Sequence, residues 1–172
     1  ITGIFFAMVF SSETTRRIDL ALKAYTASCL FSAVLGILGY FGIIGEEGLF
    51  MVYGRAAGTF KDPNVFGSFL TLGALYLLHG LFSGASRRPL LSLAGVLVLL
   101  AGIFLSFSRG SWGGSLVAIA VMVVAIYRSS SSAALRRRIV VLCVAASAAG
   151  VLALGTLFLV GNTAATFQKR AA

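Results

Sequence analysis

Residues 62–82 decide the fold and read DPNVFGSFLTLGALYLLHGLF. Asp62 is the only Asp, Glu, Lys or Arg in this stretch, and most of the remainder is apolar. A membrane-spanning helix needs about 20 mainly apolar residues. Asp62 is a typical N-cap, and Pro63 suits the first helical position. The stretch therefore predicts a helix over Val65–Phe82 that crosses a membrane.

The composition of the whole chain agrees with this interpretation. Of the 172 residues, 59% are apolar and 11% are charged, whereas about 25% of a soluble domain is charged. One water-soluble core could not bury so much apolar surface, so lipid is the expected solvent. In lipid each segment must satisfy its own backbone hydrogen bonds, which favours helices over open strands. The other expected spans are Ala24–Ile44, Leu90–Phe107, Ser111–Tyr127 and Ile139–Val160.

The expected fold class is thus all-α, a polytopic transmembrane helical bundle of about five full spans plus a partial N-terminal one. The partial span is Ile1–Phe10, which is apolar but too short to cross a membrane. At the other end, Asn162–Ala172 is polar and closes no element. We therefore expect residues 1–172 to be a single transmembrane domain and a fragment of a longer polytopic protein.

The net charge of +9 is explained by loops between the apolar runs. Nine Lys and Arg residues fall on one side, in Ser11–Lys23, Ser83–Pro89 and Arg128–Arg138, and five fall on the other. The positive-inside rule places the richer side in the cytoplasm. Loops 45–64 and 108–110 then both face the outside. No nucleic-acid-binding motif is present, so membrane lipid, and not nucleic acid, is the expected partner of this basic chain.

The first candidate site is the turn Ser108-Arg109-Gly110 between two apolar runs. A guanidinium can bind phosphate with two parallel hydrogen bonds. A helix beginning near Ser111 would add the positive end of its dipole. These groups predict a site for a lipid-linked phosphate; the alternative is an interfacial Arg whose side chain reaches water. Gly110 and Gly114 form a GxxxG pair, which favours close helix packing.

The second candidate site is the outer loop that leads into the helix at Val65. Arg55 and Lys61 are basic and are expected to line an outer groove beside Asn64. The alternative is that Asp62-Pro63-Asn64 does no more than begin the helix. The sequence has no metal-ligand set and no nucleophile motif, so neither a metal nor a cofactor is expected.

Two of these segments carry a family resemblance. Gly58-Thr59-Phe60-Lys61-Asp62-Pro63-Asn64, followed after two expected spans by Ser108-Arg109-Gly110, resembles the O-antigen ligase and O-antigen polymerase superfamily. The resemblance implies a GT-C-like helical enzyme of the bacterial inner membrane. Such an enzyme transfers a glycan from undecaprenyl pyrophosphate on the periplasmic face. Ligases transfer it to lipid A–core, and polymerases transfer it to another glycan.

The resemblance also implies residue roles. Arg109, with Ser108 and Gly110, would bind the pyrophosphate, while Asp62, Pro63 and Asn64 would position it. The family's histidine base lies in a large periplasmic loop, so we expect the base beyond Ala172 and no catalytic residue in this chain, which alone should be inactive. The alternatives are a polysaccharide polymerase of the same superfamily, a fragment of a membrane transporter and a noncatalytic membrane scaffold.

Overall fold

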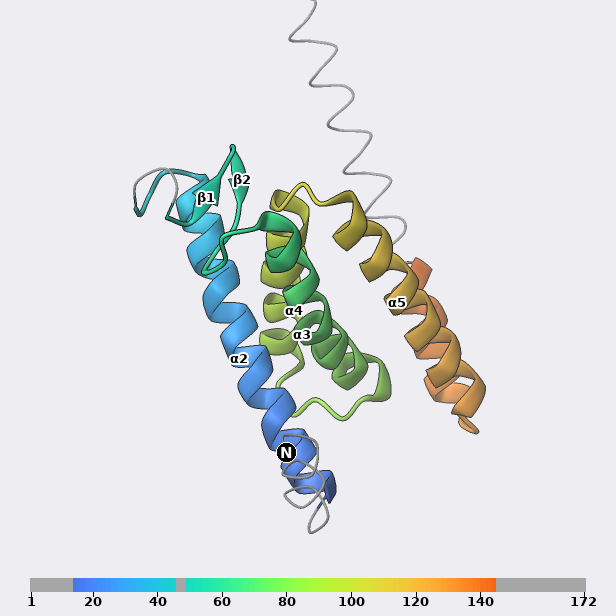
Figure 1. Ribbon diagram of the computed structural model, residues 1–172. Helices are drawn as coiled ribbons and strands as arrows, with labels where there is room; N and C mark the ends of the chain where they lie inside the picture. Colours follow the sequence, from blue (N-terminus) through green and yellow to red (C-terminus); the bar gives the residue numbers. More distant parts are fainter. Residues whose placement is uncertain (1–13, 46–48, 145–172) are drawn as a thin grey trace, which may run out of the picture. The chain divides into compact units, whose positions relative to one another are not determined.

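The computed structural model describes residues 14–45 and 49–144, which are mostly helical (Figure 1). The chain separates into two compact units, residues 1–126 and 127–172. Residues 133–144, in the second unit, are helical. The other helices are α2 (Thr14–Tyr40), α3 (Pro63–Ser83), α4 (Pro89–Leu105) and α5 (Arg109–Ser129).

Three of these helices, α2, α3 and α5, are long and apolar enough to cross a membrane. Helix α4 is apolar but has only 17 residues, which is the lower end of the spanning range of roughly 17–25. The chain is therefore that of a helical membrane protein, and its described residues contain fewer clear spans than the five expected of the whole chain. The expected span Ile139–Val160 lies mostly outside the described residues, and Ile1–Phe10 lies wholly outside them.

The start of α2 corrects one expectation, because the predicted polar loop Ser11–Lys23 is helical from Thr14 onward. The Asp19 carboxylate is 2.6 Å from Lys23 Nζ, one turn along the helix. It also accepts a hydrogen bond of 2.6 Å from the hydroxyl of Tyr76 in α3. A helix of 27 residues is about 40 Å long and exceeds a hydrocarbon layer of about 30 Å. The polar turns thus extend the helix beyond the apolar layer.

Helices α2, α3 and α4 form the core of the first unit. Phe66 and Leu70 of α3 and Leu99 of α4 are fully buried between them. Small residues allow the close approach: a Cβ on Gly73 would lie 3.0 Å from Cys29 Sγ of α2, and a Cβ on Gly102 would lie 2.7 Å from Leu70 Cδ1. Close packing through small residues is the usual basis of helix association in lipid.

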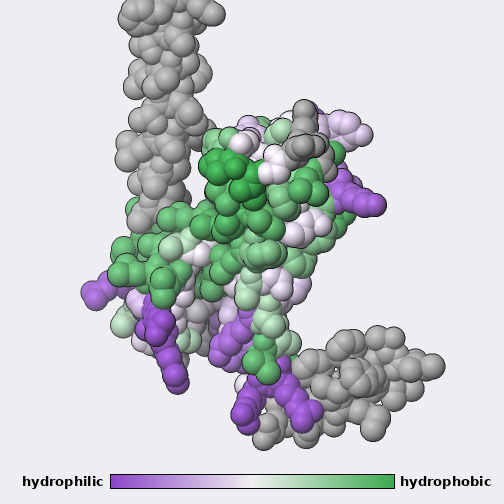
Figure 2. All heavy atoms as spheres, turned by 90° about the vertical axis from the view of Figure 1, so that its left-hand side faces the viewer, coloured by the Kyte–Doolittle hydropathy of each residue, from purple (hydrophilic) through white to green (hydrophobic). Residues whose placement is uncertain are grey.

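The outer face of α2 presents apolar side chains. Figure 2 shows a broad hydrophobic surface on this side, with hydrophilic side chains toward its ends. Leu20 and Phe31 of α2 are 67% and 65% exposed. Apolar surface of this extent is uncommon on a soluble monomer, and hydrocarbon is the solvent it fits.

A small β-hairpin lies in the loop between α2 and α3, where only irregular structure was expected. Strand β1 (Met51–Val52) pairs antiparallel with β2 (Arg55–Ala56). Tyr53 and Gly54 both have positive φ, 52° and 69°, as a type I′ turn requires. Just before β1, Phe50 packs so closely on α2 that a Cβ on Gly39 would lie 2.5 Å from Phe50 Cβ. The hairpin is therefore held against the end of α2.

Candidate functional site

The start of α3 follows the expected design. Asp62 is the N-cap, its Oδ1 accepts a hydrogen bond of 2.8 Å from the Asn64 backbone N–H, and Pro63 occupies the first turn. The segment before it is tied to α2. Ser32 Oγ accepts a hydrogen bond of 3.2 Å from the backbone N–H of Thr59, and the two side-chain hydroxyls lie 2.9 Å apart. The start of α3 is thus held by its own N-cap and by the contacts of the preceding segment with α2.

The backbone conformation and close surroundings of residue 58 explain why the motif begins with glycine. Its φ is +56°, in the left-handed region. A Cβ at this position would lie 2.6 Å from the Ser32 carbonyl oxygen and 2.6 Å from Phe66 Cε2. Phe60, two residues later, packs its ring on Phe66 and Phe69, with centroid distances of 6.4 and 4.9 Å. Gly58 and Phe60 therefore serve the fold of the loop.

Helix α5 begins two residues earlier than expected, so that Arg109 is its first residue and not part of a turn. The preceding residue, Ser108, is buried. Its Oγ accepts a hydrogen bond of 3.2 Å from the backbone N–H of Ser111 and lies 2.9 Å from the Ser111 hydroxyl oxygen. Ser108 thus acts as a neutral N-cap. Phe107, with φ 46°, makes the tight turn from α4.

The structure brings the two predicted motifs together at one end of the helices. Ser111 Oγ donates a hydrogen bond of 3.2 Å to the Asn64 carbonyl oxygen and lies 3.2 Å from Ser68 Oγ. One turn further along both helices, the hydroxyls of Thr71 and Ser115 are 2.7 Å apart. These contacts join the N-terminal ends of α3 and α5 side by side.

Arg55 of β2 makes contacts that the sequence did not predict. Its Nε donates a hydrogen bond of 2.7 Å to the Ser106 carbonyl oxygen at the end of α4, and its Nη2 donates one of 2.9 Å to Asn64 Oδ1. The guanidinium was expected to line a groove for a ligand. It connects the hairpin, the start of α3 and the turn before Arg109, and its place beside a ligand stays a prediction. Arg55 is therefore best described as a residue that positions the site.

Arg109 and Lys61 are the exposed cations of this region. Within residues 14–45 and 49–144, no hydrogen bond or ion pair engages either side chain. Arg109 stands at the N-terminus of α5, where unpaired backbone N–H groups and the helix dipole favour an anion. A guanidinium in this position can bind a phosphate group with two hydrogen bonds.

Gly110 is exposed, and the expected close packing of the Gly110 and Gly114 face is not found among the described residues. A Cβ on either glycine would meet nothing within 4 Å. The crowded face of α5 is the one that carries Ser111, because a Cβ on Gly67 of α3 would lie 2.7 Å from Ser111 Oγ. Among the described residues, α5 therefore contacts α3 through the face that carries Ser111 and not through the face of the GxxxG pair.

Sequence reasoning missed the hairpin, the bridging role of Arg55 and the row of hydroxyls between α3 and α5. A signal for the row was present: small or hydroxyl residues recur every three or four positions in both apolar runs, which is typical of packed membrane helices. The residues concerned are Gly67, Ser68 and Thr71 in α3 and Ser108, Ser111 and Ser115 at the start of α5.

The groups at this site are cations, hydroxyls, an amide and one carboxylate. Among the described residues, no cluster of three or more His, Cys, Asp or Glu side chains could hold a metal ion. No family model, curated protein or solved structure matches the chain. Its chemistry must therefore be inferred from the arrangement itself, which suits the binding of a phosphate group.

Proposed function

We propose that this chain is part of an O-antigen ligase-like membrane glycosyltransferase. It would transfer a glycan from undecaprenyl pyrophosphate to lipid A–core on the periplasmic face of the bacterial inner membrane. One observation carries the proposal. The Asp62-Pro63-Asn64 start of α3 and the Ser108-Arg109 start of α5 lie together, joined by the bond of 3.2 Å between Ser111 Oγ and the Asn64 carbonyl oxygen, and Arg109 is left exposed.

The chemistry of the transfer supports this assignment of Arg109. When an acceptor hydroxyl attacks the anomeric carbon, the bond to the pyrophosphate oxygen breaks and negative charge develops on the departing pyrophosphate. A fixed cation and backbone N–H groups aimed at that charge stabilise the transition state. Lys61 is an exposed second cation in the segment before α3. The proposal assigns no general base to a residue of this chain.

Asn64 and Asp62 support the site in different ways. The Asn64 side chain accepts from Arg55, and its carbonyl accepts from Ser111, so Asn64 joins three elements. The Asp62 carboxylate is occupied in capping α3. A carboxylate in direct contact with a phosphate group would repel it. The helix dipole of α3 and the cap hydrogen bond offset the negative charge of Asp62 where it is. We therefore infer that Asp62 fixes the helix start and does not contact the pyrophosphate.

The experiment is to substitute Arg109 in the gene of the source bacterium and to measure glycan transfer. Arg109→Ala removes a charge-stabilising donor and should reduce transfer about 100- to 1,000-fold. Arg128→Ala is the matched control, because Arg128 lies in the last turn of the same helix, and it should leave transfer within about twofold. Membrane levels of both variants are measured alongside.

The products distinguish the candidate functions. If lipid A–core no longer carries even a single glycan unit, the ligase is supported. If single units are still attached and only the long chains are missing, a polymerase of the same superfamily is supported. Unchanged transfer in a normally expressed Arg109→Ala variant contradicts the proposed role. If uptake of a solute is lost instead, a transporter is indicated.

A further inference from the structure

A short turn after α5 carries a concentration of positive charge. Helix α5 ends at Ser129, and the chain is helical again from residue 133. Exposed arginines lie on both sides of this turn, and no Asp or Glu lies near them in the sequence. We refer to residues 127–138 as the basic turn; its cations are Arg128, Arg136, Arg137 and Arg138.

Arg136 holds the basic turn in shape. Its guanidinium carbon lies 5.4 Å from the centroid of the Tyr127 ring, which is a cation–π distance. Its Nε donates a hydrogen bond of 3.0 Å to the carbonyl oxygen of Ser130, a buried residue. These contacts connect the helical segment after the turn to the end of α5, so they fix where the neighbouring arginines lie.

The other three arginines of the basic turn have no partner in the described part of the chain. Arg128, Arg137 and Arg138 are exposed, and none of the residues that the structure describes forms a hydrogen bond or an ion pair with their side chains. All five Asp and Glu residues lie in residues 1–62, where five Lys and Arg balance them, so the net charge of +9 comes entirely from residues 63–172. Charge complementarity therefore favours an anion from another molecule.

The spacing of the arginines indicates what kind of anion fits. Arg136, Arg137 and Arg138 are consecutive residues of one helical segment. Successive residues of an α-helix rise about 1.5 Å and turn by about 100°. The three side chains therefore leave the helix within about 3 Å of the same depth, in directions spread over about 200°. One phosphate group cannot contact all three, whereas a layer of phosphates around the helix can.

The basic turn lies at the boundary of the apolar part of the chain. Helix α5 is long and apolar enough to cross a membrane, and Arg128 lies in its last turn. The next apolar run of the sequence, residues 139–160, begins directly after Arg138. This is the depth at which phospholipid phosphates lie. All four cations are arginine, whose planar guanidinium binds phosphate with two hydrogen bonds.

We propose that the basic turn is a binding surface for anionic phospholipids, whose phosphates it contacts through Arg128, Arg137 and Arg138. The proposal does not depend on the proposed function, because it concerns the end of α5 away from Arg109. It also goes beyond the orientation of the chain. The positive-inside rule concerns the number of cations in a loop, whereas a binding surface requires a preference among lipids that depends on particular arginines.

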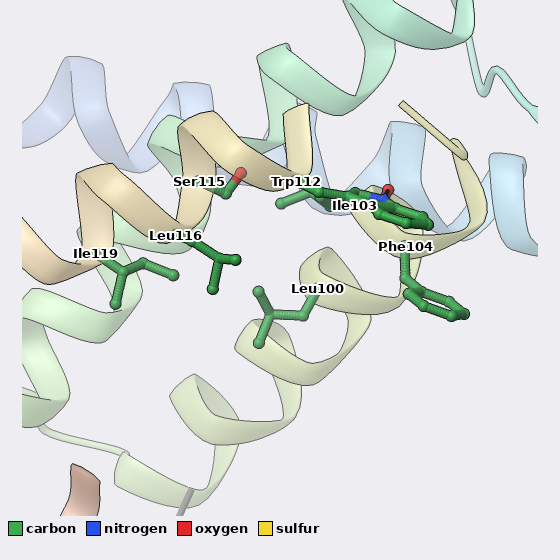
Figure 3. A pocket seen from close by; sticks show the side chains of 7 residues that line it. All are labelled: Leu100, Ile103, Phe104, Trp112, Ser115, Leu116 and Ile119. Atoms are coloured by element: carbon green, nitrogen blue, oxygen red, sulfur yellow. Dashed lines mark hydrogen bonds between the residues drawn. The ribbon is translucent and has the colours of Figure 1, made fainter. Parts of the chain in front are cut away.

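Such binding would hold the end of α5 that helix α4 does not. At the start of α5, the Trp112 indole N–H donates a hydrogen bond of 2.9 Å to the Ile103 carbonyl oxygen, and the Trp112 ring stacks on Phe104 (Figure 3). At its end, Tyr127 contacts Arg136 of the basic turn itself. A ligand that binds only the folded chain stabilises it, so anionic phospholipid should raise the temperature of unfolding.

Photocrosslinking locates the bound lipid. The purified chain is placed in phosphatidylcholine nanodiscs with an increasing mole fraction of phosphatidylglycerol that carries a photoreactive group near its phosphate. Mass spectrometry then measures the crosslinked fraction of residues 127–138. This fraction should saturate, and unlabelled phosphatidylglycerol should compete. Phosphatidylcholine with the same photoreactive group should not saturate the turn, and water-soluble glycerol phosphate, which lacks the acyl chains, should not compete.

Matched pairs of substitutions connect the binding to the basic turn. Arg137→Gln with Arg138→Gln should raise the mole fraction needed for half-saturation by about tenfold or more and remove the thermal stabilisation. Arg87→Gln with Arg88→Gln is the control, because it removes the same charge from exposed arginines in another loop, and it should stay within about twofold. Arg137→Lys with Arg138→Lys keeps the charge and should stay within about threefold.

Each contrary result overturns the proposal. Equal crosslinking by the two lipids contradicts a preference for anionic phospholipid. Equal losses in the two Gln pairs mean that overall charge, and not the basic turn, attracts the lipid. If the Lys pair loses binding as fully as the Gln pair, attraction of the cations to phosphate is not the cause. Displacement of the lipid by a short oligonucleotide identifies a soluble polyanion as the partner instead.

Discussion

Helices α3 and α5 start side by side, but their first turns differ in charge. The N-cap of α3 is Asp62, whose carboxylate already occupies the positive end of that helix. The N-cap of α5 is Ser108, a neutral hydroxyl, and the first helical residue is the cation Arg109. One helix end thus carries its own anion, while the other can bind an external one. Two adjacent helix starts of similar geometry thus differ in whether an anion already occupies them.

Among changes to the caps and contacts of the two helix starts, the largest effect is expected from giving α5 the cap of α3. Ser108→Asp preserves an N-cap acceptor but places a carboxylate next to Arg109, where it competes with phosphate. Glycan transfer should fall about 100-fold, similar to the loss of a charge-stabilising donor. The reverse exchange, Asp62→Ser, is the control and should leave transfer within about threefold, since Asp and Ser cap helices about equally well. Comparable activity of the two variants would refute the distinction between the helix starts.

The next effect concerns the loop that holds the start of α3. Gly58→Ala puts a Cβ 2.6 Å from the Ser32 carbonyl oxygen at a φ of +56°. Overpacking and the left-handed backbone together should lower the free energy of unfolding by about 3 kcal/mol. Gly54→Ala shares the positive φ but meets nothing within 4 Å, so it should cost about 1 kcal/mol. Thermal unfolding in detergent measures both, and equal losses contradict the packing argument.

A smaller effect on stability is expected from the hydrogen bonds that Arg55 makes to the start of α3 and to the end of α4. Arg55→Ala removes the hydrogen bonds of 2.7 and 2.9 Å to the Ser106 carbonyl oxygen and Asn64 Oδ1, which should lower stability by about 2 kcal/mol. Arg55→Lys should recover only part of this, because an ammonium lacks the planar fork. Lys61→Ala, an exposed cation of the same loop, should change stability by no more than about 0.5 kcal/mol. Full recovery in Arg55→Lys would show that charge, and not the two directed bonds, is what matters.

The smallest effect is expected along the row of hydroxyls. The bond of 2.7 Å between Thr71 and Ser115 should contribute about 0.6 kcal/mol, as do interhelical hydrogen bonds in lipid generally. A double-mutant cycle with Thr71→Val and Ser115→Ala isolates this coupling. A coupling free energy of zero would mean that only the contacts at the start of α5 hold it against α3.

The sequence predicted three of the helices closely, because their limits coincide with local signals. The ends of α3, α4 and α5 lie within two residues of the expected ones, and proline is the first residue of both α3 and α4. The start of α2 was missed, because Arg16, Arg17 and Lys23 are polar and a hydropathy pattern cannot distinguish a polar loop from polar helical turns. The hairpin was missed because strands of two residues are too short for an alternating pattern.

In the candidate site, the sequence predicted the start of α3 but not the contacts between the segments. Asp62 and Pro63 were assigned correctly to a helix start, because capping is a local property. That Arg55 contacts Asn64 and the end of α4 depends on a hairpin that folds back over α2, and no local pattern reports such a contact. The meeting of Ser111 with Asn64 likewise depends on Gly67, whose lack of a side chain makes room for Ser111 Oγ.

The most direct test of the central claim, that the start of α5 binds a lipid-linked pyrophosphate through Arg109, is equilibrium binding of radiolabelled undecaprenyl pyrophosphate to the purified protein in phosphatidylcholine nanodiscs. The claim predicts saturable binding that Arg109→Ala weakens about tenfold or more and that Arg128→Ala leaves within about twofold. Equal affinities of the wild-type protein and the Arg109→Ala variant would contradict the claim.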